Sequence, residues 1–259
     1  MILDEIIAWK RQEIAKRKKE MPLDAVKGRV RAGSARGFER ALVREGRLSI
    51  LAEIKRASPS AGVIREDADA GELAAAMEEA GAHALSVLTD AKYFRGSMAD
   101  LSAARSAVEI PVLQKDFVID EYQVYEAAAA GADAVLLIVR ILTDAQLAGL
   151  FSTAKAIGLG CLVEAHTAEG VKRAVSMGAK LLGINNRDLA TFKTDISTTT
   201  SLMNCVPADV KVVSQSGISR PEEAKRLFDA GVCAIQVGEG IMRADDPGAK
   251  IKELLSLVN

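Results

Sequence analysis

The same short pattern occurs four times along the chain: a helix-like segment, a glycine, and an apolar run that ends in polar residues. The four copies are EEAGAHALSVLTD (78–90), AAAGADAVLLIVR (128–140), VSMGAKLLGINNR (175–187) and FDAGVCAIQVGEG (228–240). Glycine readily adopts the left-handed backbone conformation that ends many helices, so each copy predicts a helix end followed by a strand. Regular alternation of helices and strands favours a parallel sheet.

Four further strand candidates lie between these copies, at residues 48–55, 111–117, 158–166 and 210–216. The predicted helices cover residues 70–80, 98–107, 121–130, 143–157, 167–177, 197–205, 219–230 and 247–257. Runs such as AVLLIV and LSVLT are apolar on both faces, as strands must be when helices cover the sheet. This α/β pattern predicts a closed (β/α)8 TIM barrel. An open doubly wound sheet is the alternative, but no GxGxxG motif follows the first strand.

We interpret residues 1–259 as a single barrel domain, of which residues 1–46 are an N-terminal helical extension. Apolar residues recur at roughly helical spacing near the start: Ile2, Leu3, Ile6, Ile7 and Ile14. This spacing predicts an amphipathic helix over residues 2–20, with an exposed Arg-Lys-Lys face and with its apolar face packed on the barrel. The extension has 12 Lys and Arg against 7 Asp and Glu, whereas the rest has 22 against 28. Such a basic segment can dock on acidic surface or bind an anion.

Composition and charge exclude several classes of protein. Hydrophobic residues at 49% and charged residues at 27% are ordinary globular values. The net charge of −1 gives no global attraction to nucleic acid. MILDEIIAWK has acids where a secretory signal needs a basic segment, and no apolar run approaches a membrane-spanning length. We therefore expect a cytoplasmic protein without a membrane partner, with Cys161, Cys205 and Cys233 reduced and no metal-ligand spacing among them.

Polar residues gather where the predicted strands end, and a barrel of this kind places its active site at the carboxyl ends of its strands. Glu53 and Lys55 lie two positions apart on the first strand, so their side chains share a face. The candidates on later strands are Thr89, Lys115, Arg140, Glu164, His166, Asn185, Arg187, Gln215 and Ser216. Their recurrence at one end of successive strands indicates a functional site.

Each candidate also has a structural interpretation. Glu53 and Lys55 can form an ion pair at the barrel mouth, Arg140 can form a loop salt bridge, and His166 can be a surface histidine. His83, at a strand start, is interpreted as structural. Two acids just past their strands can cap helices or pair with neighbouring cations: Asp116 and Asp188.

Two segments after the last strands are typical of phosphate sites. Ser216-Gly217-Ile218 and Gly238-Glu239-Gly240 place small residues where backbone N–H groups are exposed near a helix N-terminus. Turn glycines are the structural alternative for each segment alone. On adjacent last strands, the pair favours a phosphorylated ligand.

Long segments of the chain resemble the indole-3-glycerol phosphate synthase family, in that family's order. They are LAEIKRASPSAG, VLTDAKYFRGS, VLQKDFVIDEYQ, ADAVLLIVRIL, LVEAHTAEG, GINNRDL, SQSGI and VGEGIMR. The resemblance implies the substrate 1-(2-carboxyphenylamino)-1-deoxyribulose 5-phosphate. It implies conversion to indole-3-glycerol phosphate, carbon dioxide and water in L-tryptophan biosynthesis, by general acid–base catalysis with no metal and no organic cofactor.

The resemblance also implies roles for individual residues. Lys115 matches the general acid of ring closure, and Glu164 matches the general base. Glu53 and Lys55 match residues that orient the intermediate and help its dehydration, and Asn185 matches a group that holds the intermediate. The other substrate-binding positions are Arg187, Gln215 and Ser216, with apolar walls from Phe94, Phe117 and Leu189. The positions implied around the phosphate are Ser58, Ser216, Gly217, Gly238, Glu239 and Gly240.

Lysine is a poor acid at its ordinary pKa. Two converging ammoniums lower each other's pKa, whereas adjacent glutamates oppose that effect. The sequence leaves open which effect prevails at Lys55 and Lys115.

Two positions depart from the family pattern. The family usually has Glu where this chain has Gln215, and glutamine cannot transfer a proton as a carboxylate does. We expect weakened turnover that Gln215→Glu would raise. Many relatives have Ser where this chain has Gly240, and the missing hydroxyl is expected to weaken phosphate binding slightly.

Two other functions remain open from sequence. One is another phosphate-binding barrel, such as a sugar-phosphate isomerase or aldolase, against which the Glu-x-Lys strand and the separate Lys-Asp-Phe segment argue. The other is a barrel that binds the phosphate ester without turnover. We expect a monomer or weak homodimer. The resemblance implies that the extension covers the active site, so deletion of residues 1–46 is expected to raise KM.

Overall fold

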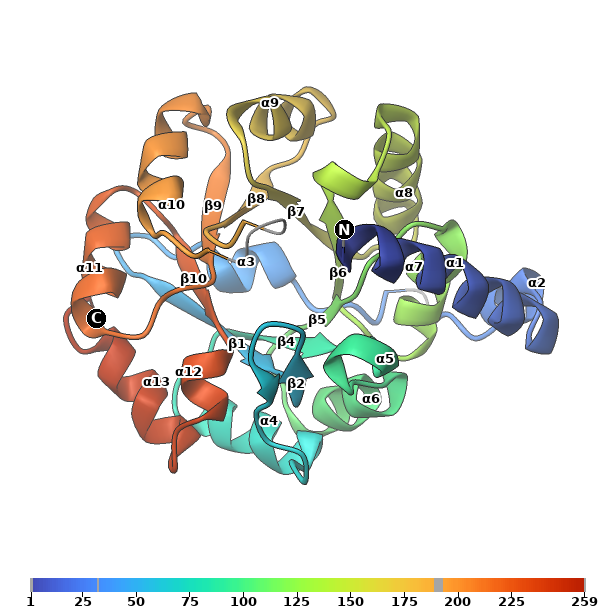
Figure 1. The fold of residues 1–259 in the computed structure, drawn as a ribbon, viewed down its shortest axis with the longest axis horizontal. Coiled ribbons are helices and arrows are strands. Elements are labelled where there is room, and N and C mark those ends of the chain that lie inside the picture. Colours follow the sequence, from blue (N-terminus) through green and yellow to red (C-terminus); the bar gives the residue numbers. More distant parts are fainter. Residues whose placement is uncertain (1, 32, 189–192, 259) are drawn as a thin grey trace.

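The computed structural model describes residues 2–31, 33–188 and 193–258. Within these ranges, eight parallel strands close into a barrel in the order β1-β10-β9-β8-β7-β6-β5-β4 (Figure 1). The strands are β1 Ser49–Ile54, β4 Ala84–Leu88, β5 Val112–Lys115, β6 Ala134–Ile138, β7 Gly160–Ala165, β8 Leu181–Asn185, β9 Lys211–Gln215 and β10 Ala234–Val237. The predicted (β/α)8 barrel is therefore confirmed.

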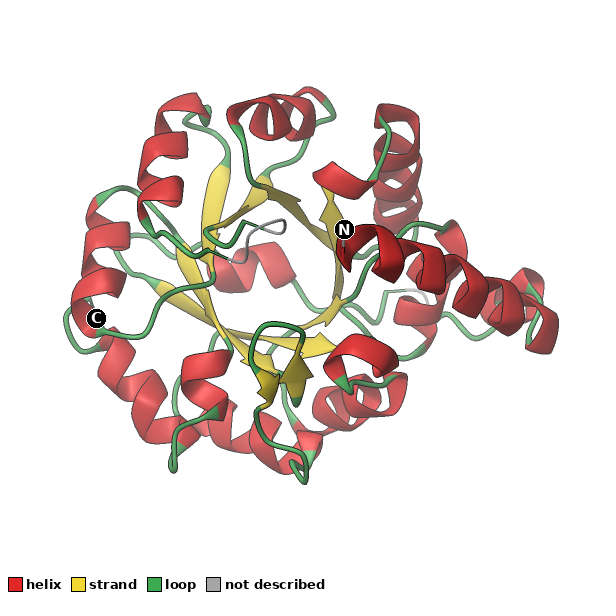
Figure 2. Cartoon of the chain, viewed as in Figure 1, coloured by secondary structure: helices red, strands yellow, loops and turns green. Residues whose placement is uncertain are grey.

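Helices surround the ring of strands (Figure 2). They are α4 Ala70–Glu79, α6 Met98–Ala107, α7 Glu121–Ala129, α8 Asp144–Ala156, α9 Ala168–Ser176, α10 Ser197–Leu202, α11 Pro221–Asp229 and α13 Pro247–Leu255. The glycines of the four sequence copies all have positive φ, at 98° for Gly81 and Gly178 and 91° for Gly131 and Gly231. The predicted helix ends before these four strands are thus confirmed.

Several short elements were not predicted, because one or two turns carry too little periodicity to be recognised. They are α2 Leu23–Lys27, α3 Phe38–Leu42, α5 Ala91–Phe94, α12 Glu239–Met242, the 3₁₀ turns η1 Val139–Ile141 and η2 Met203–Cys205, and a hairpin of β2 Ala57–Ser58 with β3 Gly62–Val63. Helix α10 ends at Leu202, earlier than predicted, and η2 follows it. Several of these elements follow barrel strands and shape the site.

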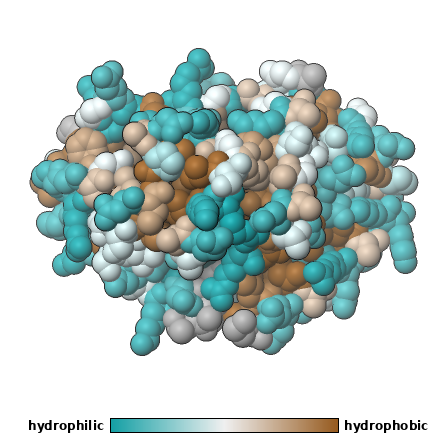
Figure 3. Space-filling model, turned by 90° about the horizontal axis from the view of Figure 1, so that it is seen from above, coloured by the Kyte–Doolittle hydropathy of each residue, from teal (hydrophilic) through white to brown (hydrophobic). Residues whose placement is uncertain are grey.

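In the described residues the core has three parts: one between the strands and the outer helices, one inside the barrel, and a small one where Ile14, Val26 and Tyr122 meet. The inner part includes Leu51, Leu113 and Leu162, together with Phe38 and Leu42 of α3. Helix α3 therefore closes the N-terminal end of the barrel. On the side of the molecule in Figure 3, hydrophilic side chains surround smaller hydrophobic areas. No helix in the described ranges is long and apolar enough to span a membrane.

The predicted first helix is confirmed as α1 Ile2–Glu20. Lys18 and Lys19 of its Arg-Lys-Lys face are exposed as predicted, whereas Arg17 is half-buried. Arg17 pairs with Glu126 at 3.0 Å, and Lys18 pairs with Asp120 at 2.7 Å. These contacts attach α1 to the barrel through α7 and the residue that caps it.

Candidate active site

Glu53 stands at the centre of the cluster of charges at the carboxyl ends of the strands. Its carboxylate is 4% exposed and bridges two ammoniums, with Lys55 Nζ 2.8 Å from Oε1 and Lys115 Nζ 2.9 Å from Oε2. Lys55 follows β1 directly and Lys115 ends β5, so barrel closure brings together residues far apart in sequence. The ion pair between Glu53 and Lys55 that the sequence allowed is present, and Lys115 also pairs with Glu53.

Neighbouring charges determine whether Glu53 and Lys115 are protonated. Burial raises the pKa of the Glu53 carboxyl, but Lys115 and Lys55 outweigh burial and hold the pKa well below its usual range. Burial lowers the pKa of the Lys115 ammonium, but the Glu53 and Glu164 carboxylates prevail and raise it. Glu53 is therefore ionised and Lys115 is protonated at neutral pH.

A second polar group lies on β7 and β8. Glu164 is 2% exposed, and its Oε1 accepts a hydrogen bond from Asn185 Nδ2 at 3.3 Å. His166 Nε2 lies 3.5 Å from the same oxygen. His166 is thus next to Glu164 rather than on the open surface. Asn185 also accepts a hydrogen bond from the backbone N–H of Arg187 at 3.0 Å.

An apolar hollow opens above these charged residues. Its lining combines Glu53, Lys55, Lys115, Glu164, Asn185 and Arg187 with Phe94, Phe117, Leu136 and Ile138, and it includes Ser58 and Ser216. The rings of Phe94 and Phe117 are 6.1 Å apart between centroids and tilted by 42°. Ile2, Leu3 and Ile6 of α1 form one wall. A planar aromatic ligand fits a lining of this kind. Leu189 lies outside the described residues.

A second hollow, the glycine-loop hollow, adjoins the first. Its lining includes residues 215–219 and 236–240, and it shares Glu53, Lys55, Lys115, Arg187 and Ser216 with the apolar hollow. Ser216 and Gly217 both have positive φ, at 69° and 80°. A positive φ is uncommon for serine and marks a constrained turn.

Close packing explains Gly238 at the edge of the glycine-loop hollow. A Cβ atom there would lie 2.3 Å from Glu53 Oε1, so only glycine lets the loop approach the carboxylate. Glu239 begins α12, and its carboxylate contacts Arg243 at 3.1 Å and Arg187 at 3.7 Å. Its side chain is therefore engaged by arginines.

The chain that forms these two adjoining hollows, with Glu53 and its lysines between them, matches a known family. The family model for indole-3-glycerol phosphate synthase matches residues 3–254. The chain belongs to the indole-3-glycerol phosphate synthase family. This membership confirms the family and the enzyme class predicted from the sequence motifs.

Relatives named indole-3-glycerol phosphate synthase cover almost the whole chain. The protein from Polaromonas sp. (strain JS666 / ATCC BAA-500) is 46% identical over 99% of this chain and 98% of its own length. The protein from Desulfosudis oleivorans is 51% identical over 82% of this chain and 81% of its own. The one from Caldanaerobacter subterraneus is 45% identical over 100% of this chain and 99% of its own.

Solved structures at lower identity show the fold alone. A 3-hexulose-6-phosphate synthase has a TM-score of 0.65 at 20% identity, covering 82% of this chain and 100% of its own. A mutant tryptophan synthase alpha-subunit from Pyrococcus furiosus has a TM-score of 0.62 at 14% identity, covering 83% of this chain and 99% of its own.

Some of the polar candidates from the sequence lie outside both hollows. Arg140 is exposed in η1. Thr89 is buried and donates a hydrogen bond to Asp116 Oδ2 at 2.7 Å. His83 accepts one from the Ile50 N–H at 3.1 Å and contacts Arg44, as a structural histidine does. Asp116, by contrast, lines the apolar hollow, and it pairs with Lys10 at 2.9 Å, so its predicted pairing with a cation is confirmed.

Sequence reasoning missed several residues of the site. Ser60 accepts a hydrogen bond from Arg187 Nη1 at 2.6 Å. Gln236, inside the apolar run AIQV, contacts Glu53. Leu136 and Ile138 line the apolar hollow but look like ordinary strand residues. Buried Lys10 was available as a signal, because it continues the helical spacing of the apolar face of α1.

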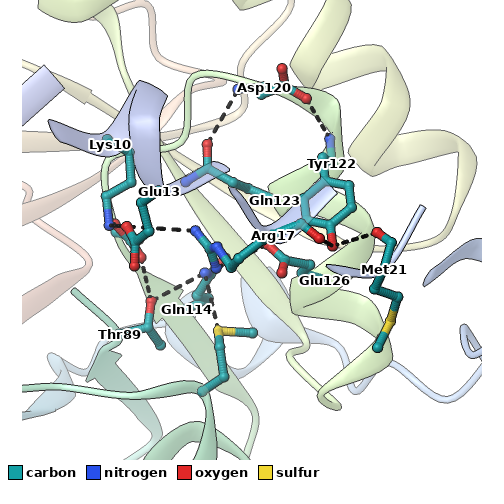
Figure 4. A network of polar contacts seen from close by, with 12 residues as sticks. Lys10, Glu13, Arg17, Met21, Thr89, Gln114, Asp120, Tyr122, Gln123 and Glu126 are labelled. Carbon is teal, nitrogen blue, oxygen red and sulfur yellow. Dashed lines mark hydrogen bonds and ion pairs between the residues drawn. The ribbon is translucent and has the colours of Figure 1, made fainter. Parts of the chain in front are cut away.

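Lys10 connects α1 to the site loops (Figure 4). Its Nζ is 2.8 Å from Asp90 and 2.9 Å from Asp116, and all three side chains are almost fully buried. Asp90 caps α5, which carries Phe94, and Asp116 lies between Lys115 and Phe117. In the described ranges, no group of three or more His, Cys, Asp or Glu residues is placed to hold a metal ion.

Proposed function

We propose that this chain catalyses the decarboxylating ring closure and dehydration of 1-(2-carboxyphenylamino)-1-deoxyribulose 5-phosphate, giving indole-3-glycerol phosphate, carbon dioxide and water in L-tryptophan biosynthesis. The observation that carries the proposal is the position of Glu53 with Lys55 and Lys115. This charged group lies between an apolar hollow suited to an arene and a glycine-lined hollow suited to a phosphate.

Ring closure requires a proton donor at the ribulose carbonyl while the aryl carbon attacks it. Lys115 takes this role, because its raised pKa keeps the ammonium protonated. The new carbon–carbon bond forms as the carbonyl oxygen takes up the proton, and the carboxylate carbon then leaves as carbon dioxide. Lys55 lies near the substrate carboxylate and orients it, with Glu53 fixing both ammoniums.

Dehydration requires a base and a proton for the departing hydroxyl. Glu164 is the base, and the Asn185 amide holds its carboxylate at 3.3 Å. Protonation of the hydroxyl by a lysine releases water, while Glu164 removes the proton whose loss completes the indole ring. Phe94 and Phe117 grip the aromatic ring and exclude water.

The phosphate occupies the glycine-loop hollow. The backbone N–H groups of Ser216, Gly217, Gly238, Glu239 and Gly240 are its donors. The Glu239 carboxylate is directed to Arg187 and Arg243, so this residue serves through its backbone. Ser58 lines the apolar hollow and reaches the ligand from that side, and Arg187 borders both hollows.

We further propose that residues 1–259 form one domain that works in the cytoplasm as a monomer or weak homodimer. The three cysteines are free thiols, as expected in a reducing compartment.

The test is fluorescence-detected formation of indole-3-glycerol phosphate, with Lys115→Ala and the exposed-lysine control Lys172→Ala. Loss of general acid catalysis should lower kcat by about 10²-fold or more in Lys115→Ala, while Lys172→Ala keeps parental kinetics. Saturable substrate binding without turnover in the parent would instead show a barrel that only binds the phosphate ester.

A further inference from the structure

Gln236 joins two residues that the sequence motifs had singled out. It lies on β10, level with Gln215 of β9 and next to β1, and its side chain is 3% exposed. Its Nε2 lies 2.6 Å from Glu53 Oε2 and 3.2 Å from Ser86 Oγ. Its Oε1 lies 2.6 Å from Gln215 Nε2. The three side chains form a buried chain of hydrogen bonds from Gln215 to Glu53.

The chemistry of Glu53 fixes the orientation of both amides. An ionised carboxylate only accepts hydrogen bonds, so Gln236 must present its NH₂ group to Glu53. The carbonyl oxygen of Gln236 then faces position 215. That oxygen needs a donor, and the NH₂ group of Gln215 supplies it.

We propose that Gln236 is a positioning residue that holds the Glu53 carboxylate for the reaction, and that Gln236 requires a hydrogen-bond donor at position 215. The role deepens the proposed function and rests on it, because Glu53 in turn holds Lys55 at 2.8 Å and Lys115 at 2.9 Å. Two donors to Glu53 Oε2, from Lys115 and Gln236, leave the carboxylate little freedom to turn.

An ionised carboxylate at position 215 conflicts with this arrangement. Its oxygen would face the Gln236 carbonyl at close to the present 2.6 Å. Rotation of the Gln236 amide would only move the conflict to Glu53. The cations that line the same hollow are already engaged: Lys55 and Lys115 pair with Glu53, and Arg187 and Arg243 pair with Glu239. Gln215→Glu is therefore expected to lower turnover, which reverses the expectation drawn from the family motif.

The experiment is a double-mutant cycle of Gln215→Glu and Gln236→Leu, read by kcat, KM and the thermal unfolding temperature of the free protein. Gln236→Leu should lower kcat about tenfold while KM changes less than about threefold, because the walls that bind the substrate remain. Gln215→Glu should cost about tenfold in kcat/KM in the parent and less than about twofold beside Gln236→Leu, where the opposing carbonyl is gone.

The control is Gln146→Leu. Gln146 is exposed on α8 and accepts a hydrogen bond from the Thr143 N–H at 3.0 Å, so its loss affects a helix cap and leaves kcat and KM unchanged. If Gln236→Leu does not fold, Gln236→Met fills the same space without hydrogen bonds.

The proposal would be overturned if the effects of the two substitutions on kcat/KM or on the unfolding temperature were additive. The unfolding temperatures test the coupling without turnover. An inactive parent with non-additive unfolding would contradict the proposed function and leave the link between positions 215 and 236 supported.

Discussion

Gly240 has room for a larger side chain, unlike its neighbour Gly238. A Cβ atom at Gly240 would lie 3.7 Å from Val237 Cγ1 and 3.8 Å from the Ile218 carbonyl oxygen, which are ordinary contacts. A serine hydroxyl here would add a donor beside the position proposed for the phosphate. Gly240→Ser is expected to lower KM about threefold with kcat unchanged, a gain typical of one hydrogen bond. Steady-state kinetics would measure it.

Gly238→Ser is the matched comparison for that experiment. The added Cβ would lie 2.3 Å from Glu53 Oε1, so displacement of the carboxylate should lower kcat. If Gly240→Ser left KM unchanged, a donor at this position would not reach the phosphate.

His83 makes folding stability depend on pH. Burial and the Arg44 guanidinium lower its pKa to about 4, whereas an unfolded histidine has a pKa near 6.5. Between these values the unfolded chain binds a proton that the folded chain does not. This contribution to stability is therefore present above pH ~6.5 and is lost as pH falls toward 4.

The measurement compares Tm against pH for the parent and His83→Gln. Because His83 is half-buried, solvent screening limits the loss to about 1 kcal/mol, or about 2–4 °C in Tm. That part of the Tm decline should be missing in His83→Gln. Equal slopes in the two proteins between pH 6.5 and 4 would rule out His83 as the source.

At the residue scale, the sequence predicts many of the side chains that line the site but not which of them meet. Glu53 and Lys55 share a face by the two-residue period of a strand, and their contact is confirmed. Lys115 contacts Glu53 from 62 residues away, a distance in sequence that only barrel closure removes. Gln236 gave no signal, since one polar residue within an apolar strand is compatible with packing alone.

At the element scale, a buried cation holds α1 in place. Lys10 is fully buried against Asp90 and Asp116, and these carboxylates outweigh the effect of burial and raise its pKa. Lys10→Met would leave two buried carboxylates without their cation, a loss of about 3–5 kcal/mol that detachment of α1 can relieve. We expect KM to rise about tenfold, because Ile2, Leu3 and Ile6 would leave the apolar hollow.

Trp9 reports the position of α1 independently of kinetics. It is the single tryptophan of the chain, and Lys92 Nζ of α5 lies 4.1 Å from the centre of its ring. Detachment of α1 in Lys10→Met should shift the Trp9 emission to longer wavelength. Lys16→Met, at a lysine 78% exposed on the same helix, should leave the emission and KM as in the parent. Parental fluorescence and KM in both variants would show that α1 stays in place without Lys10.

Long helices were easier to predict from the sequence than short ones. Helix α1 and the barrel helices other than α10 have enough turns for an apolar face to repeat, and they were predicted close to their bounds. The short elements α3, α5 and α12 are fixed by what they pack against rather than by a pattern of their own. Helices α5 and α12 carry Phe94 and Glu239, which the family resemblance named, but no pattern in the sequence predicted the helices that place them.

At the scale of the whole molecule, the N-terminal extension reaches both ends of the barrel. Helix α1 covers the apolar hollow at the carboxyl ends of the strands, whereas α3 packs Phe38 and Leu42 into the opposite end. The sequence indicated an amphipathic helix that docks on the barrel, and this helix is α1. It did not indicate that α3 closes the opposite end, because this segment of five residues has no recognisable period.

Two truncations separate these roles. Removal of residues 1–20 deletes α1 alone, so the barrel should remain folded while KM rises about tenfold. Removal of residues 1–46 also takes Phe38 and Leu42, which are 2% and 0% exposed, and should cost several further kcal/mol as a cavity opens in the inner core. Thermal unfolding followed by circular dichroism measures the difference, with Phe38→Ala in the full chain as control. Equal Tm values for the two truncations would mean that α3 does not support the barrel, and KM would then be the only property that the extension controls.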